Sequence, residues 1–287
     1  MPHADIRFHR IDPEKDRERL RRFLSAIDPA DYLLEGLTEW IREGRHWVAI
    51  EARTWVAFGR LHDLGDGEGW LSGARVVPER RGQGLGAILL ERLISEADST
   101  GISDLRVVIE DENIASSRLV HRFGFRPIQA LTVRVGSPAV ASDHPWHRAS
   151  PVERLDGPVG WLASIVGRVD LLPGSDGGRF GAWRSSLVAR WASEQKLYLG
   201  PDLAVGIQTD WWRNPRTLWV SPLRGDLSSL LPALGGLTNE LGHEQWQAFL
   251  PSSEELRAQY ERYGLKPHPH WGDRAHLYER GSHGSSS

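Results

Sequence analysis

The chain contains no cysteine among its 287 residues. This absence excludes disulfide bonds, metal sites built from thiolates and a cysteine nucleophile. The sequence also lacks an uninterrupted apolar run long enough to span a membrane, and its first residues lack the basic and apolar regions of a secretory signal peptide. We therefore expect a cytoplasmic protein that has no membrane as a partner.

Neither sign of charge is in large excess. The 35 basic and 38 acidic residues leave a formal net charge of −3. A chain with this balance has no general attraction to polyanions, so we expect no nucleic acid partner.

Metal-ligand patterns are also missing. Three histidines gather near prolines late in the chain, but no carboxylate or cysteine completes a recognised ligand spacing around them. They are His268, His270 and His276. We interpret them as loop histidines and expect no bound metal.

The length and the 40% hydrophobic content favour two packed domains. We place the first domain at 1–137 and the second at 159–280. The intervening segment, 138–158, mixes prolines with serine, aspartate and glycine and is therefore expected to be a linker. By composition, 281–287 is a flexible tail.

The most informative segment joins a short apolar strand to an apolar-periodic helix through a basic, glycine-rich turn. The three glycines lie at Gly82, Gly84 and Gly86, beside Arg81. The first turn of a helix has free N–H groups and partial positive charge, and glycine lets a phosphate approach them closely. The turn therefore predicts a pyrophosphate site.

Two known patterns compete for this turn. Read as Gly82-x-Gly84-x-x-Ala87, it loosely matches a dinucleotide-binding loop, but Pro78 to Arg81 separate the strand from the first glycine and no series of parallel strand and helix units follows. Read as Arg81-x-x-Gly84-x-Gly86 after a Val-x-Pro-like strand end, it resembles motif A of the GNAT superfamily of acyl-CoA-dependent N-acyltransferases.

A second signature of that family follows at the expected spacing. The alternating Leu105, Val107 and Ile109 predict a strand, Asn113 comes next, and a helical segment leads to Gly124-Phe125. One departure is Val120, which occupies the position where many family members carry a tyrosine that protonates the departing CoA thiolate.

The resemblance implies an α+β fold, an α/β/α sandwich around a mixed, mostly antiparallel sheet, present as two tandem domains. The periodicity of the first third fits it. We expect a strand at 6–10, helices at 13–26 and 30–43, strands at 46–51 and 55–61, and a strand that ends at Pro78.

The resemblance also implies acetyl-CoA as co-substrate. A main-chain N–H at Val76 or Val77 would polarise the thioester carbonyl, Asn113 and Ser116 would lie near the pantetheine, and the glycine turn would hold the pyrophosphate. The implied cofactor-binding residues are Val76, Val77, Arg81, Gly82, Gln83, Gly84, Leu85, Gly86, Asn113 and Ser116.

Catalytic residues are less well defined by the sequence. Glu68, before the central strand, and Glu110, at the end of the next strand, are candidates for the base that takes the amine proton. His121 is a candidate acid beside Val120, although it lies one helical step from that position. Glutamates are usually exposed at the protein surface, which is the alternative interpretation of Glu68 and Glu110.

The second half resembles a degenerate copy of the first. Tyr260 to Pro267 parallel Val120 to Pro127 in aromatic, glycine and proline placement, whereas Asp226 and serines follow Gly225 where the first copy has its later glycines. We therefore expect acetyl-CoA to bind only the first domain. Tyr260 is a remnant of a once active copy, a side chain of the core or a contributor to the acetyl-CoA site across the domain interface. Core packing is the favoured interpretation.

Three classes of function remain open at this stage. The leading one is an N-acetyltransferase that acts on an amine of a small molecule or peptide. The alternatives are a non-catalytic acyl-CoA sensor and an interaction scaffold in which the degenerate domain offers a dimer surface. A homodimer is therefore among the expected assemblies, and nothing in the sequence identifies the acceptor.

Overall fold

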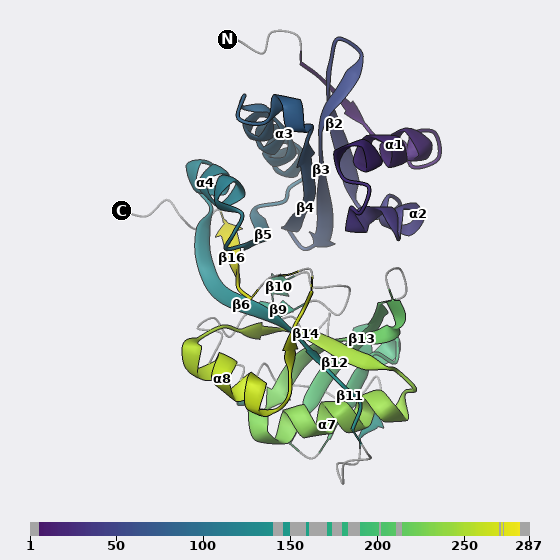
Figure 1. Ribbon diagram of the computed structural model, residues 1–287, viewed down its shortest axis with the longest axis vertical. Coiled ribbons are helices and arrows are strands. Elements are labelled where there is room, and N and C mark those ends of the chain that lie inside the picture. Colours follow the sequence, from purple (N-terminus) through teal and green to yellow (C-terminus); the bar gives the residue numbers. More distant parts are fainter. Residues whose placement is uncertain are drawn as a thin grey trace. The chain divides into compact units, whose positions relative to one another are not determined.

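The computed structural model describes residues 6–139, 146–149, 159–160, 171–173, 180–182, 190–200, 202–210, 214–269, 271 and 273–281 (Figure 1). Most of the expected linker, the expected tail after Gly281, and His270 lie outside the described residues. The domain boundaries at 137 and 159 therefore stay predictions. Within the described part of the chain, no helix has the length and hydropathy needed to span a bilayer.

The chain forms two compact units that interleave in the sequence. The first unit contains Met1–Ile109, Asn113–Pro127 and Tyr278–Ser287, and the second contains Glu110–Glu112 and Ile128–Leu277. Each unit is a mixed sheet with helices, so the fold is α+β, as predicted.

The first unit follows the predicted order of elements. Its elements are β1 (Arg7–Arg10), α1 (Arg17–Ile27), the 3₁₀ helix η1 (Tyr32–Leu34), α2 (Leu37–Trp40), β2 (Arg45–Glu51), β3 (Thr54–Gly65), β4 (Glu68–Val76), η2 (Pro78–Arg80), α3 (Leu85–Ser99), β5 (Asp104–Glu110) and α4 (Ile114–Arg122). Strands β1 to β4 pair antiparallel in chain order, and β4 pairs with β5 in parallel.

Helices cover both faces of this sheet because side chains alternate along each strand. On β2, Val48 packs with α1 and α2, whereas the next residue, Ala49, packs with α3 and α4. Two apolar cores result, one on each face, and Figure 1 shows α1 and α2 across the strands from α3. The predicted helical spacing of α3 is confirmed, since Leu85, Leu89 and Leu93 are buried.

Two predicted helices differ from the structure. The carboxylate of Asp12 accepts hydrogen bonds from the N–H groups of Glu14 and Lys15, which forms a turn, and α1 begins only at Arg17. The helix expected at 30–43 is divided into η1 and α2, because Asp31 accepts a hydrogen bond from the Leu33 N–H and thereby caps a separate short turn.

From β11 to α8, the second unit repeats the order of strands and α-helices that runs from β2 to α4 in the first. Its elements are β6 (Arg126–Gly136), β7 (His147–Arg148), β8 (Val159–Gly160), β9 (Leu171–Pro173), β10 (Phe180–Ala182), β11 (Leu197–Leu199), β12 (Ala204–Asp210), β13 (Asn214–Gly225), α7 (Leu227–Glu240), β14 (Gln245–Pro251), α8 (Glu254–Arg262), β15 (Lys266–Pro267) and β16 (Ala275–Arg280). Strands β11, β12 and β13 pair antiparallel, and β13 pairs with β14 in parallel. Helices α7 and α8 contribute to one core with these strands.

The sequence halves exchange strands. Strand β6 follows α4 in the chain, yet most of it belongs to the second unit, where Leu131–Gly136 pair antiparallel with β14. Strand β16 ends the second half, yet its residues from Tyr278 onward belong to the first unit, beside β5. Each unit is thus completed by a strand from the other half of the sequence.

A buried ion network ties the exchanged strand into the first unit. The Arg106 guanidinium donates from Nη1 to Glu68 at 2.6 Å and from Nε to Glu279 on β16 at 2.8 Å. Arg106 is only 3% exposed and Glu68 only 5%. The three charges therefore join β4, β5 and β16 away from water.

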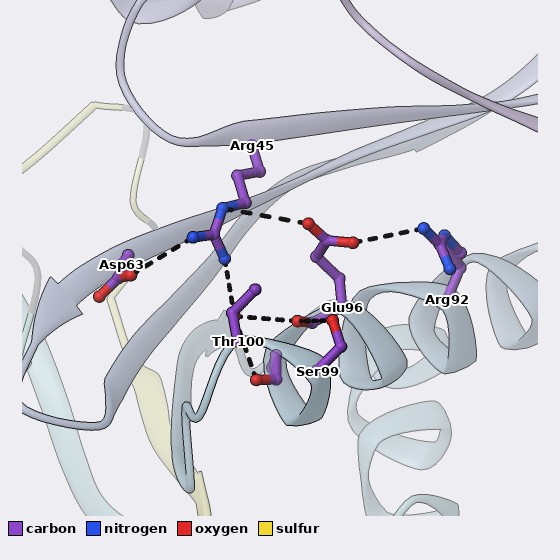
Figure 2. A network of polar contacts seen from close by, with 7 residues as sticks. Arg45, Asp63, Arg92, Glu96, Ser99 and Thr100 are labelled. Carbon is purple, nitrogen blue, oxygen red and sulfur yellow. Dashed lines mark hydrogen bonds and ion pairs between the residues drawn. The ribbon is translucent and has the colours of Figure 1, made fainter.

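A second polar network fixes the C-terminal end of α3 (Figure 2). Arg45 on β2 donates to the Thr100 hydroxyl at 2.7 Å and lies 4.0 Å from the Glu96 carboxylate and 3.6 Å from that of Asp63. Arg92 donates to the other Glu96 oxygen at 3.3 Å. These contacts hold α3 against β2 and β3, and so fix the helix that begins in the glycine turn.

His46 is a buried histidine on β2. Its ring lies 4.6 Å from that of Trp40 and 5.9 Å from that of Phe58, measured between centroids. Burial lowers the pKa of His46 well below the ordinary 6.5, and the positive charges of Arg60, His62 and Arg10 act in the same direction. The folded protein therefore holds His46 neutral.

The neutral His46 predicts an acid-dependent loss of stability. Below pH 6.5 the unfolded chain binds a proton at this residue and the folded chain does not. The contribution of His46 to the free energy of unfolding is therefore greatest above pH 6.5, and it decreases as the pH falls below that value. The slope attributable to one residue is at most about 1.4 kcal/mol per pH unit. Urea midpoints at pH 7.5 and 5.5 should differ less in His46→Phe than in the wild type, and equal differences would contradict this assignment.

Candidate functional site

The carboxyl end of β4 presents one main-chain N–H group that the sheet does not use. The Val77 N–H donates to the Val56 carbonyl at 3.1 Å, which makes Ala57 and Val76 a non-hydrogen-bonded pair between β3 and β4. The Val76 N–H therefore faces away from β3. Of the two predicted donors, Val77 is used within the sheet and Val76 remains.

The side toward which Val76 faces is where β4 and β5 separate. Their parallel ladder joins Glu68 to Asp104, Gly69 to Leu105 and Trp70 to Arg106, and within the fully described strands it extends no further. Strand β4 also has a register irregularity beyond that point, opposite Gly59 of β3, where Gly73 has a positive φ of 66°. The two strands thus part before the Val76 N–H is reached.

The turn after β4 has a defined internal structure. The Arg80 guanidinium donates to Gln83 Oε1 at 2.7 Å and to Glu51 at 2.9 Å, and the Gln83 amide donates to the Glu79 carbonyl at 3.1 Å. The Arg81 Nε donates to the Val76 carbonyl at 3.2 Å. These bonds hold the turn against the ends of β2 and β4 before any ligand binds.

The start of α3 exposes a row of unpaired donors. Helix α3 is capped by Gly84, which has no side chain to accept from the first turn, and Gly82 and Gly84 have positive φ values of 74° and 87°. Within the described residues, no acceptor pairs with the N–H groups from Gly82 through Gly86. With the helix dipole and Arg81, these donors form a site suited to a phosphate group.

Two residues of the turn have further roles. The Leu85 side chain is buried at 1% exposure in the core, so only its main chain faces the turn. A Cβ atom on Gly86 would lie 3.3 Å from the Leu119 side chain, so Gly86 allows α3 and α4 to pack closely. The two sequence motifs therefore meet in the structure.

Asn113 and Ser116 form the start of α4. The Asn113 side chain accepts a hydrogen bond from the Ser116 N–H at 3.1 Å, which is an ordinary helix cap. Asn113 is exposed and Ser116 is partly exposed. Both residues can contact a ligand at this end of the helix.

The three candidate catalytic residues lie in different surroundings. Glu68 is at the beginning of β4, the opposite end from Val76, and its carboxylate is occupied by Arg106. Glu110 is the last residue of β5 and, by the alternation of strand side chains, shares a face of that strand with Arg106. His121 is exposed on α4, and its ring meets that of Tyr278 edge-on at 5.3 Å.

The corresponding helix start in the second unit is filled by its own side chain. Asp226 caps α7, accepting from the Ser229 N–H at 3.0 Å, the Ser229 hydroxyl at 2.9 Å and the Ser228 hydroxyl. These hydrogen bonds lower the pKa of Asp226 to about 2, so it is a carboxylate at neutral pH. A second phosphate would meet this negative charge.

Tyr260 is a core residue of the second unit. It is fully buried, its hydroxyl donates to the Pro251 carbonyl at 3.0 Å, and burial raises its pKa. These contacts favour the core-packing interpretation of this tyrosine.

Two of the three late histidines, His268 and His276, lie within the described residues. His268 is buried, and His276 bonds the Asp111 carboxylate at 2.7 Å. Among the described residues, no group of three or more histidine, aspartate or glutamate side chains is arranged to hold a metal ion.

A mixed sheet whose central parallel strands separate beside a glycine turn with unpaired N–H groups is what the resemblance to acyl-CoA-dependent acyltransferases implies. The comparisons agree with this class. Residues 16–125 match the family model described as the acetyltransferase (GNAT) family. This part of the chain is thus similar to a GNAT domain, and the whole chain shares the fold of a tandem GNAT protein. No curated protein matches the chain significantly.

Solved structures share the fold over nearly the whole chain. A candidate acetyltransferase from Thermoplasma acidophilum has a TM-score of 0.62 at 18% identity, covering 96% of this chain and 99% of its own. A GCN5-related N-acetyltransferase from Sphaerobacter thermophilus has a TM-score of 0.60 at 14% identity, covering 98% and 96%. A tandem GNAT protein from the clavulanic acid biosynthesis pathway has a TM-score of 0.56 at 14% identity, covering 98% and 100%.

Proposed function

We propose that the protein is an N-acetyltransferase that uses acetyl-CoA as donor and an amine of a small molecule or peptide as acceptor. The observation that carries the proposal is the pairing of two features in the first unit. Unpaired N–H groups from Gly82 through Gly86 suit a pyrophosphate, and the Val76 N–H is directed toward the side on which β4 and β5 part.

The residues of the turn fit a CoA thioester. Five main-chain donors and Arg81 would bind the pyrophosphate, and Asn113 and Ser116 would contact the pantetheine. The bound thioester supplies an activated acyl carbon. The Val76 N–H would stabilise negative charge that develops on the carbonyl oxygen during attack.

Glu110 and Glu68 are the two bases that the sequence offers for the incoming amine. The Glu68 carboxylate is held by the buried Arg106 in an ion pair. His121 is exposed and can exchange protons with water near α4.

A calorimetric titration with acetyl-CoA tests the proposal. We expect one equivalent to bind per chain, because Asp226 occupies the helix start of the second unit. Release of free thiol with a panel of small and peptide amines would then measure turnover. Two equivalents would contradict the assignment of a single site, and absence of binding would overturn the proposed function.

One observation favours a second candidate, a non-catalytic acyl-CoA sensor. Val120 is buried and apolar where the family tyrosine acts as a proton donor. A sensor would bind one equivalent of acetyl-CoA and release no thiol with any amine tested.

A further inference from the structure

The side chain of Tyr278, on the last strand β16, contacts helix α4. The Tyr278 hydroxyl donates to the Ser117 hydroxyl at 3.2 Å, and its ring meets that of His121 edge-on. Tyr278 and Val120 belong to the same apolar core and are each 5% exposed. Ser117 and His121 are four residues apart and are therefore neighbours on the surface of the helix, and Val120 lies three residues after Ser117.

This arrangement places a phenol against the turn of α4 that carries Val120. Val120 and the Tyr278 ring both pack in the apolar core of the first unit. A short side chain on α4, Val120, thus lies in the same core as a large one from β16, Tyr278, although the two residues are distant in the sequence. The Ser117 bond orients the hydroxyl toward α4.

The same turn of α4 lies next to the anion-binding turn. Leu119 is the residue that Gly86, in the first turn of α3, approaches most closely. Val76, Val77 and Leu119 pack against the core that contains Tyr278. Tyr278 thus shares one apolar core with residues at the end of β4 and with Leu119 of α4.

A leaving thiolate in such surroundings needs a donor. The thiol of cysteine has a pKa of about 8.5, and an anionic sulfur is disfavoured among apolar groups. A phenol, with an ordinary pKa of about 10, is neutral at pH 7 and can donate its proton. His121 is the alternative acid on this helix, but it is exposed to water.

We propose that Tyr278 is the proton donor to the departing thiolate, an inference that rests on the proposed function. As the amine nitrogen bonds to the acyl carbon, the carbon–sulfur bond breaks and its electron pair stays on sulfur. The Tyr278 proton moves to that sulfur, and the phenolate regains a proton from water. The proton lost by the amine passes to the base and then to water.

The test compares two variants that lose the same hydrogen bond. Tyr278→Phe removes the donor, and Ser117→Ala removes its acceptor but keeps the phenol. A structural role predicts equal shifts in the thermal midpoint and equal effects on kcat. A donor role predicts that kcat falls on the order of 100-fold in Tyr278→Phe and within about threefold in Ser117→Ala, and that only Tyr278→Phe changes the basic limb of the pH profile.

Binding provides a readout that does not need turnover. Calorimetry should find that the wild type and Ser117→Ala bind CoA about tenfold more tightly than CoA lacking its sulfur, because the thiol gains a hydrogen bond. Tyr278→Phe should bind the two compounds alike. If both variants retain the preference and match in kcat, Tyr278 is only a packing residue. If the wild type binds neither compound, the proposed function fails together with this inference.

Discussion

Gly84→Glu should weaken acetyl-CoA binding by at least about 100-fold. A glutamate at this helix cap would accept hydrogen bonds from the first turn of α3, as Asp226 does in α7, and its charge would repel the pyrophosphate. The positive φ of 87° at Gly84 adds strain for any larger residue. Calorimetric titration of the variant measures the loss directly.

A matched control separates binding from folding. Gly242 is exposed, has a similar φ of 72° and has open space around the position of a Cβ atom. Gly242→Glu therefore introduces the same charge and similar backbone strain in the second unit. It should shift the thermal midpoint comparably and bind acetyl-CoA as the wild type does. If Gly84→Glu also binds normally, the pyrophosphate site is not in this turn.

Arg106→Met should lower the free energy of unfolding by about 3 kcal/mol or more. The change keeps much of the side-chain volume but removes the positive charge between Glu68 and Glu279. Two carboxylates would then face each other with little access to water, because Glu68 is 5% exposed. Urea denaturation at pH 7 measures the effect.

The control for this variant is an exposed ion pair in the same unit. Arg42 lies 3.3 Å from Glu14, and both side chains are more than half exposed, at 57% and 72%. Arg42→Met should cost less than about 1 kcal/mol, as is usual for surface pairs. Similar small losses in both variants would mean that the Arg106 network contributes little to stability.

The local features of the site were predictable from the sequence. Glycine spacing and apolar periodicity are short-range signals, so they correctly predicted a helix that begins within the glycine turn and a strand before Asn113. The acid at Asp226 likewise marked the second helix start as different, and its carboxylate caps α7. These features depend only on neighbouring residues.

Features set by long-range pairing were not predictable in the same way. The alternation of β6 and β16 fits either sheet, so nothing local in these strands specifies that Tyr278 belongs to the first unit. The occupation of Glu68 by Arg106 follows from the register of β4 and β5, which only the folded sheet defines. The loss of Val77 as a free donor has the same origin, because Val56 accepts its hydrogen.

The exchange of β6 and β16 has a consequence for synthesis on the ribosome. The glycine turn, α3 and α4 are translated early, but Tyr278 and Glu279 emerge only after nearly all of the second half has been made. Until then β5 lacks its neighbouring strand and Arg106 lacks one of its carboxylates. The first unit therefore cannot finish folding as a nascent fragment. It becomes complete only after the ribosome has synthesised nearly all of the second half.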